Sequence, residues 1–171
     1  MVQTDGSGLL GPSSYKTFGR NRSLRLPTFD YASEHAYFLT VRAIPQATPF
    51  THARLAEATI RCLFHCREQY DYAVFAYCLM PDHFHLLARP KDQSVALSRF
   101  VGAFKSLSTR ACWKEGFHGA LWQKHFYEHV VRTEESLVPI VEYILDNPIR
   151  SGIAASRNEC AHCGILDEIP A

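Results

Sequence analysis

The sequence predicts an α+β fold: a split βαβ antiparallel sheet, ferredoxin-like or RRM-like, with helices on one face. Some segments alternate apolar and polar positions and are rich in aromatic and β-branched residues, which is typical of strands. Others repeat apolar residues every three or four positions, which is typical of helices. They follow one another as strand, helix, strand, strand, helix, strand, helix. Such a sheet leaves its second face free to meet a ligand.

The expected elements cover most of the central part of the chain. The strands are expected at 36–44, 72–80, 83–89 and 121–132, and the helices at 51–69, 94–112 and about 134–146. Pro81-Asp82 predicts the turn of a hairpin between the second and third strands. Thr133 is expected to cap the last helix and Pro148 to end it.

The chain of 171 residues is long enough for one domain with its own core. Residues 1–30 are rich in Gly, Ser, Pro and Arg and predict an extended basic N-terminal arm. The domain proper is expected at 31–153 and a C-terminal tail at 154–171. No apolar run approaches the ~20 residues that span a bilayer, and the first residues lack a signal-peptide pattern. We therefore expect a cytoplasmic protein outside any membrane.

The formal net charge is only +1, so the total charge does not indicate nucleic-acid binding. Its distribution is more informative, because basic residues concentrate in 11–26 and in 93–132. A locally basic surface can hold a phosphate backbone even when the total charge is near zero. From charge alone, this interpretation and ordinary solvated helix faces are about equally good.

The chain has six cysteines, and two of them form a CxxC pair at Cys160 and Cys163. A tetrahedral zinc site needs four ligands, which usually come as two such pairs. Cys62 and Cys66 lie in a helical pattern and make a poor second pair. We therefore expect buried thiols and a flexible or oxidisable tail, and not a zinc site.

The first pattern with chemical meaning is His83-Phe84-His85. In a strand, residues i and i+2 point to the same face, so both imidazoles would leave the open face while Phe84 enters the core. Two neutral imidazoles at this spacing can share one divalent ion. Taken alone the pattern is weak, because many such pairs are ordinary surface or core histidines.

The second pattern is the helical segment that contains Tyr143 and Asn147, which are i and i+4 and share one helix face. At ~100° per residue, Tyr143 lies at the flank of the apolar stripe of this helix. A flank position can reach along the sheet toward another site. Taken alone, a half-buried tyrosine with its hydroxyl in water is the better interpretation of this pattern.

Together these segments resemble the REP-associated tyrosine transposases, which are single-tyrosine HUH transposases. The resemblance rests on YCLMPDHFHLLARP, LWQKHFYEHVVR and VEYILDNPIRSG, with support from RLPTFDY and AYFLTVR, and covers roughly residues 20–153. It implies that His83 and His85 bind the catalytic metal, that Tyr143 is the nucleophile, and that Asn147 completes the metal site. Because Asn147 precedes Pro148, it is expected to tend away from helical geometry.

The resemblance also implies a reaction and its partners. The enzyme would cleave and rejoin single-stranded or hairpin, REP-like DNA through a 5′-phosphotyrosine intermediate. A divalent ion, Mg²⁺ or Mn²⁺, would withdraw charge from the phosphodiester, and Mn²⁺ accepts imidazole ligands more readily. The family contains both monomers and homodimers. We expect the DNA to meet basic residues of the arm and of the second helix and its following segment: Arg20, Arg22, Arg25, Lys105, Arg110 and Lys124.

Several alternatives stay open at this point. Tyr127 and His129, on the last expected strand, are rivals for the catalytic roles, with Tyr127 well behind Tyr143. Trp122 and Gln123 support either DNA or the core. A split βαβ sheet with exposed aromatic residues also describes RNA-recognition modules, which bind single strands without cutting them. A third interpretation is a domesticated transposase that only binds its hairpin.

Overall fold

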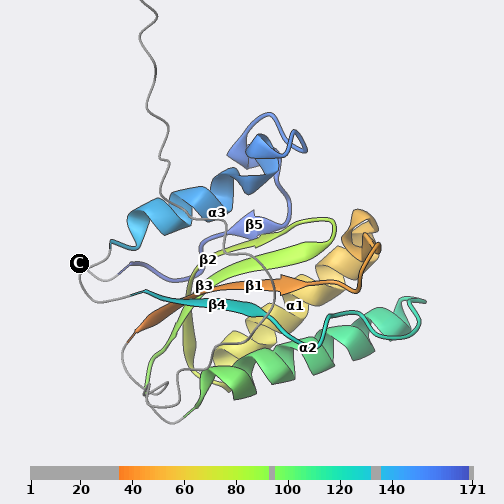
Figure 1. Cartoon of the computed structure of the whole chain (residues 1–171), viewed down its shortest axis with the longest axis horizontal. Helices are drawn as coiled ribbons and strands as arrows, with labels where there is room; N and C mark the ends of the chain where they lie inside the picture. Colours follow the sequence, from red (N-terminus) through yellow and green to blue (C-terminus); the bar gives the residue numbers. More distant parts are fainter. Residues whose placement is uncertain (1–34, 93–94, 132–135, 170–171) are drawn as a thin grey trace, which may run out of the picture.

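The computed structural model describes residues 35–92, 95–131 and 136–169. A five-stranded antiparallel sheet forms its centre, with the strands in the order β4-β1-β3-β2-β5 (Figure 1). The strands are β1 Ala36–Arg42, β2 Tyr72–Leu79, β3 His83–Pro90, β4 Tyr127–Val131 and β5 Cys163–Gly164. The order of the first four is that of a split βαβ unit, so the predicted α+β class is confirmed. The hairpin between β2 and β3 is confirmed as well.

The three helices divide between the two faces of the sheet. Helices α1 (Ala53–Gln69) and α2 (Leu97–Lys114) share one apolar core with one face, whereas α3 (Val138–Arg150) packs in a second core on the other face. Figure 1 shows α1 and α2 together on one side of the sheet and α3 apart from them. The face that we expected to be open is thus partly covered by α3, whose apolar residues Ile140, Val141 and Ile144 are buried there.

This arrangement explains the burial of β2, which is buried at all eight of its positions. Alternate side chains of β2 enter the two cores, as Tyr77 and Leu79 enter the core of α1 and α2 while Cys78, between them, enters that of α3. A strand covered on both faces needs apolar residues at successive positions, and YAVFAYCL provides them. Strand β2 therefore places the Cys78 thiol in a solvent-excluded environment next to α3.

Some element bounds differ from those predicted. Strand β4 is shorter than 121–132, because Trp122 makes only an isolated bridge to Ala43 before the chain reaches Tyr127. Helix α3 begins at Val138, and Thr133, the expected cap, lies outside the described residues. The prediction that Pro148 ends the helix is wrong: α3 runs through it to Arg150. A proline so close to the end removes one helical hydrogen bond and no following turn.

The C-terminal segment is attached to the sheet and is not a flexible tail, whereas its Cys160–Cys163 disulfide agrees with the expectation of an oxidisable one. Strand β5 pairs with β2, and the Asp167 carboxylate accepts hydrogen bonds from the Arg67 guanidinium and the Val74 backbone N–H. Arg157, in the 3₁₀ turn Arg157–Glu159, donates to the carboxylate of Asp146 on α3. The predicted basic arm at 1–30 lies outside the described residues. Across the described ranges, no helix combines the length and apolar character that a membrane crossing requires.

Candidate metal and tyrosine site

One register position crosses all five strands on the face that carries α3. Cys163 of β5 pairs with Cys78 of β2, Cys78 with His85 of β3, His85 with Thr40 of β1, and Thr40 with Tyr127 of β4. Side chains directly opposite one another in neighbouring strands point to the same face. A thiol, an imidazole, a hydroxyl and a phenol therefore lie side by side in one row.

The two predicted metal-binding histidines converge beside this row. Phe84 is fully buried in the other core, as expected, so His83 and His85 share the face of α3. Their Nε2 atoms lie 3.0 Å apart. Each Nδ1 has its own partner, the Asp82 carboxylate at 2.6 Å from His83 and the Thr40 hydroxyl at 3.0 Å from His85.

This arrangement fits a divalent ion. Metal-binding histidines almost always bond a carboxylate or another polar group through the second ring nitrogen, which fixes ring orientation. Two nitrogens at about 2.1 Å from one ion and at about 90° to one another, as in octahedral coordination, lie about 3.0 Å apart. The separation of the two Nε2 atoms in the chain matches that distance. The donor set and its outer partners thus suit one shared ion.

With both rings neutral and no ion bound, the hydrogen bonds also indicate where the protons lie. The Asp82 carboxylate only accepts, so His83 donates from Nδ1 and presents a lone pair at Nε2. His85 then donates from Nε2, and its Nδ1 accepts from the Thr40 hydroxyl. An ion would need both Nε2 lone pairs, so the His85 proton would move to Nδ1. Thr40 suits this change because a hydroxyl both donates and accepts.

The environment of His85 keeps its ring neutral. Only 6% of the residue is exposed. Burial, followed by repulsion from His83 when that ring is protonated and from the Arg42 guanidinium, lowers the pKa of His85 to about 3, and the carboxylate of Asp82 opposes this only in part. Neutral imidazole is the form that binds metal, so His85 is ready as a ligand throughout the physiological range.

We expect this lowered pKa to appear in the stability of the metal-free protein. As the pH falls below the usual histidine range, the unfolded chain binds this proton while the folded chain does not. The free energy of unfolding therefore decreases from about pH 6.5 toward pH 3, by about 1.4 kcal/mol per pH unit from this group. Urea denaturation at pH 7 and pH 5 should show wild type losing about 2 kcal/mol more than His85→Gln. Equal losses in the two proteins would show that His85 has an ordinary pKa in the folded chain.

Tyr143 meets this site from helix α3. Its ring contacts His85 at a centroid distance of 6.0 Å and Phe38 edge-on at 5.8 Å. The Arg150 guanidinium carbon lies 4.9 Å from the centre of the same ring. Tyr143 is half-buried at the flank of the apolar stripe, as its helical position predicted. The fold thus brings Tyr143 beside the histidine pair from 58 positions later in the chain than His85 (143 − 85).

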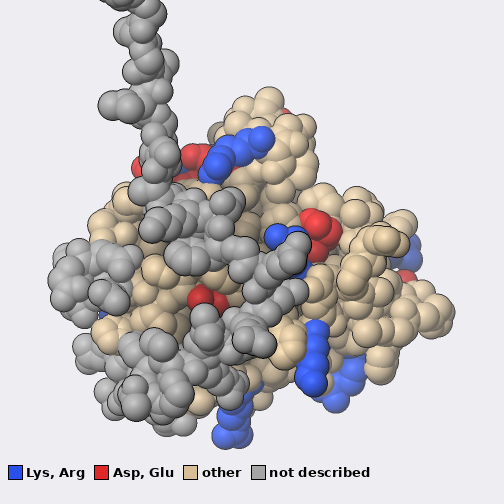
Figure 2. Space-filling model, viewed as in Figure 1, with Lys and Arg blue, Asp and Glu red and all other residues tan. Residues whose placement is uncertain are grey.

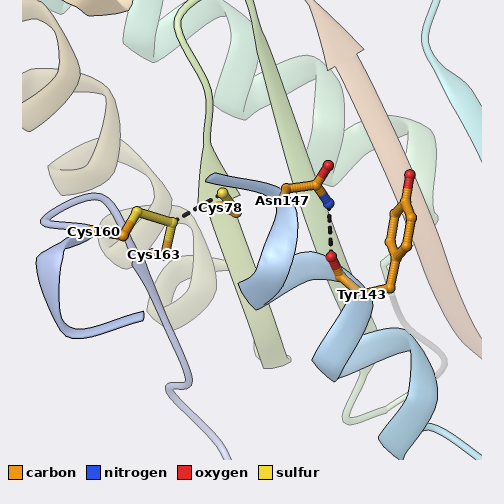
Figure 3. Close-up of a disulfide and its surroundings, with 5 residues drawn as sticks. All are labelled: Cys78, Tyr143, Asn147, Cys160 and Cys163. Atoms are coloured by element: carbon orange, nitrogen blue, oxygen red, sulfur yellow. Dashed lines mark hydrogen bonds between the residues drawn. A yellow bond between two sulfur atoms is a disulfide. The ribbon is translucent and has the colours of Figure 1, made fainter. Parts of the chain in front are cut away.

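Asn147 lies one turn after Tyr143 on the same helix. The expectation that Asn147 departs from helical geometry is wrong, because α3 continues through it. Its side-chain amide donates to the Tyr143 carbonyl oxygen at 2.8 Å. Figure 3 shows the remaining Asn147 oxygen and the Tyr143 hydroxyl pointing the same way from α3. That oxygen is the atom available for a metal, and its role as a ligand stays a prediction.

The rival residues are on the same face of the sheet. Tyr127 lies opposite Thr40 and is 42% exposed, and His129 lies opposite Phe38. Burial of part of the ring raises the pKa of Tyr127, which disfavours its phenolate. Because Tyr127 shares the row of His85, geometry alone does not remove it as a rival nucleophile.

The predicted DNA-binding residues differ in what the fold does with them. Arg20, Arg22 and Arg25 lie outside the described residues. The Lys105 ammonium donates to the backbone carbonyls of Gln123 and Lys124, and burial lowers its pKa. Lys105 thus holds the 123–124 segment in place, and its contact with DNA stays a prediction.

Arg110 and Lys124 are exposed, and Arg110 belongs to α2, on the opposite face of the sheet from Tyr143. Figure 2 shows Lys and Arg side chains at several separate places on the surface that faces the viewer.

Trp122 and Gln123 serve the framework of the fold. The Trp122 indole N–H donates to the Ser108 hydroxyl at 2.8 Å, and its ring packs against Phe50 and Phe104. The Gln123 amide donates to the Ala43 carbonyl oxygen. The alternative in which these two residues support the core is therefore the one that the contacts favour.

Three residues of the site were missed from sequence. Asp82 was treated only as a turn residue, although its position next to His83 was a usable signal. Arg150 is seven positions after Tyr143, on the same helix face, and this spacing indicates that the two side chains are neighbours. Thr40 is 45 positions from His85, and only the pairing of β1 with β3 reveals it.

Replacing Asp82 with Ala should weaken metal binding at the histidine pair. Without the carboxylate, His83 loses the bond that fixes its ring and its proton, and the loss of such outer partners costs about 10–100-fold in metal affinity. Titration of the metal-free protein with Mn²⁺, followed by electron paramagnetic resonance of the free ion, measures this. Asp71→Ala is the matched control, because Asp71 is exposed and pairs with Lys91. Unchanged Mn²⁺ affinity in Asp82→Ala would remove Asp82 from the site.

Two proteins of Haemophilus influenzae are similar in sequence to this chain. A Haemophilus influenzae protein provisionally named a REP-associated tyrosine transposase is 30% identical over 95 residues. The match covers 50% of this chain and 54% of that protein, so it spans about half the length of the relative. A second, uncharacterised H. influenzae protein is 26% identical over 158 residues, covering 75% of this chain and 88% of its own.

Solved structures show the same fold. A REP-associated tyrosine transposase, solved bound to a REP hairpin, superposes with a TM-score of 0.69 at 18% identity, over 85% of this chain and 82% of that one. A provisionally assigned transposase from Deinococcus radiodurans matches with a TM-score of 0.50 at 22% identity, over 74% and 95% of the two chains. The family described as "Transposase IS200 like" matches residues 32–147. Because this match covers more than half of the chain, the protein belongs to the IS200-like transposase family.

Proposed function

We propose that this protein is a metal-dependent transposase that cleaves and rejoins single-stranded DNA through a covalent bond to Tyr143. One observation supports this above the others. The Nε2 atoms of His83 and His85 converge at 3.0 Å with both Nδ1 atoms engaged, and the Tyr143 ring contacts this pair. In a member of the IS200-like transposase family, this combination has a direct chemical use.

In the proposed reaction, the Tyr143 oxygen attacks a phosphorus atom of the strand. A bond from this oxygen to phosphorus forms, the bond from phosphorus to the 3′ oxygen breaks, and the phenolic proton balances the charge on the departing 3′-hydroxyl. The product is a 5′-phosphotyrosine that conserves the phosphodiester bond energy. Attack by a second 3′-hydroxyl then reverses these steps, so strands are rejoined without ATP.

The side chains around the tyrosine would each have a part in this reaction. His83, His85 and the Asn147 oxygen would hold a Mg²⁺ or Mn²⁺ ion, which supplies Lewis-acid withdrawal of charge from the phosphate. Phe38 and Arg150 pack on the Tyr143 ring and limit its rotation. Arg150 is also exposed beside the ring, so its guanidinium is placed to hold a phosphate oxygen of the strand.

We propose a single-stranded or hairpin DNA substrate of the REP-like kind. The related transposase solved with a REP hairpin supports this, as does the basic composition of residues 11–26. A bacterial chromosome is the place where such DNA is met, which agrees with the cytoplasmic location predicted from sequence. Short inverted repeats in the DNA that flanks the gene would supply the hairpins to test.

The polarity of the covalent bond gives a sharp test of this function. A hairpin oligonucleotide is labelled at its 3′ end in one sample and at its 5′ end in another, and incubated with protein and Mn²⁺. Denaturing electrophoresis should show the 3′ label on the protein and the 5′ label on a shortened free strand. Labels in the reverse places would contradict a 5′-phosphotyrosine. Tight binding with no adduct in either sample would favour a domesticated protein that only binds its hairpin.

Replacing Arg20, Arg22 and Arg25 together with Ala should weaken binding of single strands and leave the fold intact. Each phosphate contact on a single strand contributes about 0.7 to the slope of log affinity against log salt, so the slope should become shallower by about 2. Fluorescence anisotropy of a labelled hairpin across salt concentrations measures this. A lowered melting temperature with an unchanged salt slope would assign these arginines to the fold.

A further inference from the structure

Three cysteine sulfurs meet at the edge of the sheet beside the catalytic candidates. Cys160 and Cys163, in the C-terminal segment, form a disulfide, and the Cys78 thiol of β2 contacts the Cys163 sulfur at 2.9 Å (Figure 3). The three sulfur atoms all lie within 4.8 Å of one another. Cys78 is fully buried, and the other two are partly buried. Cys62, Cys66 and Cys112, the other three cysteines, are free thiols elsewhere in the fold.

We propose that these three sulfurs, when the Cys160–Cys163 bond is reduced, form a binding site for one zinc ion. Zinc bonds thiolate sulfur at about 2.3 Å, which places the sulfurs of one tetrahedral site about 3.8 Å apart. Because the three sulfurs already lie within 4.8 Å of one another, such an ion could contact all three once the Cys160–Cys163 bond is opened. Soft thiolate ligands also select zinc over the Mg²⁺ or Mn²⁺ proposed for the histidine pair.

The spacing of the ligands supports this proposal. A CxxC pair presents two sulfurs to one ion, and zinc sites commonly combine such a pair with ligands from a distant segment. The distant ligand here is Cys78, 85 positions before Cys163. The sequence alone argued against zinc because Cys62 and Cys66 make a poor second pair. The pairing of β2 with β5 supplies Cys78 in their place.

A reducing compartment would favour the thiol form of the pair. If the protein acts on chromosomal DNA, as we propose, it works where disulfides are rare and CxxC patterns more often bind metal. Two molecules of an external thiol would together supply the two electrons and two protons that reduce the disulfide to the Cys160 and Cys163 thiols, and would themselves be joined as a disulfide. Zinc would then displace the protons of the three thiols into solvent.

The fourth coordination position would belong to water. His162 lies between the paired cysteines, but its ring is not part of the cluster, and its backbone carbonyl accepts a hydrogen bond from the N–H of Leu79. Three protein ligands with one exchangeable position are a common arrangement for zinc. The ion would fasten the two-residue strand β5 to β2 at Cys78, directly beside His85 in the next strand.

Zinc content of the full-length protein tests the proposal. The protein is reduced with a phosphine, supplied with zinc, freed of excess, and its bound metal is measured by mass spectrometry. The measurement is made in a His83→Ala/His85→Ala background, so that the histidine pair cannot contribute. We expect one zinc per chain in this background. The same content is expected when Cys62→Ser, the matched control at a free thiol, is added to it. Cys78→Ser and Cys163→Ser should each lower zinc affinity at least tenfold.

Cobalt replacement identifies the ligands independently of any activity. The reduced protein loaded with Co²⁺ should show the charge-transfer absorption of cobalt–thiolate bonds, and Cys163→Ser should reduce it. Should Cys78→Ser fail to fold, the partly buried Cys163 carries the test. A reduced protein that binds no zinc, or a Cys163→Ser variant that binds as well as Cys62→Ser, would overturn the proposal. Neither result depends on DNA cleavage, so this site and the transposase function can fail separately.

Discussion

Tyr143→Phe should abolish the covalent protein–DNA adduct while hairpin binding stays within about twofold of wild type. The substitution removes one oxygen and keeps the ring that contacts His85, Phe38 and Arg150. Loss of a nucleophile lowers the rate by at least about 10³-fold, since the surrounding groups cannot replace it. The adduct is measured by denaturing electrophoresis with the 3′-labelled hairpin, and binding by anisotropy of the same strand.

Tyr127→Phe is the matched control, because Tyr127 also lies on the face of His85 and opposite Thr40. We expect it to keep the adduct at a rate near that of wild type. If Tyr127→Phe lost the adduct and Tyr143→Phe kept it, the nucleophile would be on β4. If both variants kept it, neither tyrosine would form the bond. Melting temperatures of both variants should stay close to wild type, so that a loss of adduct is not a loss of fold.

The parts of the site that follow from local periodicity could be predicted from sequence. The alternation of a strand placed His83 and His85 on one face and Phe84 in the core, and both placements are confirmed. Helical periodicity placed Tyr143 at the flank of the stripe of α3, where its ring is found. These predictions needed only the angle between neighbouring residues, which the backbone geometry fixes.

The parts that depend on long-range pairing could not be predicted. Thr40 orients His85 from another strand, and nothing in a single sequence states the register of β1 against β3. Strand β5 is two residues long, too short for an alternation to be recognised, so its pairing with Cys78 was missed. The position of α3 on the second face likewise depends on where the segment 136–169 packs. An apolar stripe indicates which face of a helix is buried, but not which face of the sheet it packs against.

Local rules also failed where tertiary contacts outweighed them. Pro148 was expected to end α3, but it lies buried in the last turn, where one missing hydrogen bond costs little. The expectation that Lys105 contacts DNA stays a prediction, but its basic segment did not indicate that its ammonium bonds the backbone carbonyls of the segment after α2. The charge of a lysine is visible in a sequence, whereas the acceptor it meets is not.

His83→Ala/His85→Ala should lose both Mn²⁺ binding at this site and the DNA adduct. The two Nε2 atoms are the converging donors of the site, so their removal leaves the Asn147 oxygen as the only proposed protein ligand. Metal affinity should fall at least about 100-fold, and the adduct below detection. Mn²⁺ titration by electron paramagnetic resonance and the 3′-labelled hairpin assay measure the two losses separately.

The matched control for this pair is His52→Ala/His65→Ala, which removes two exposed histidines at the start and on the surface of α1. It should keep both Mn²⁺ binding and the adduct. Because His85 is buried, the double variant is first checked for folding by its melting temperature, and His83→Ala alone serves if His85→Ala destabilises the core. A folded His83→Ala/His85→Ala protein that formed the adduct at the wild-type rate would show that cleavage does not use a metal held by these histidines.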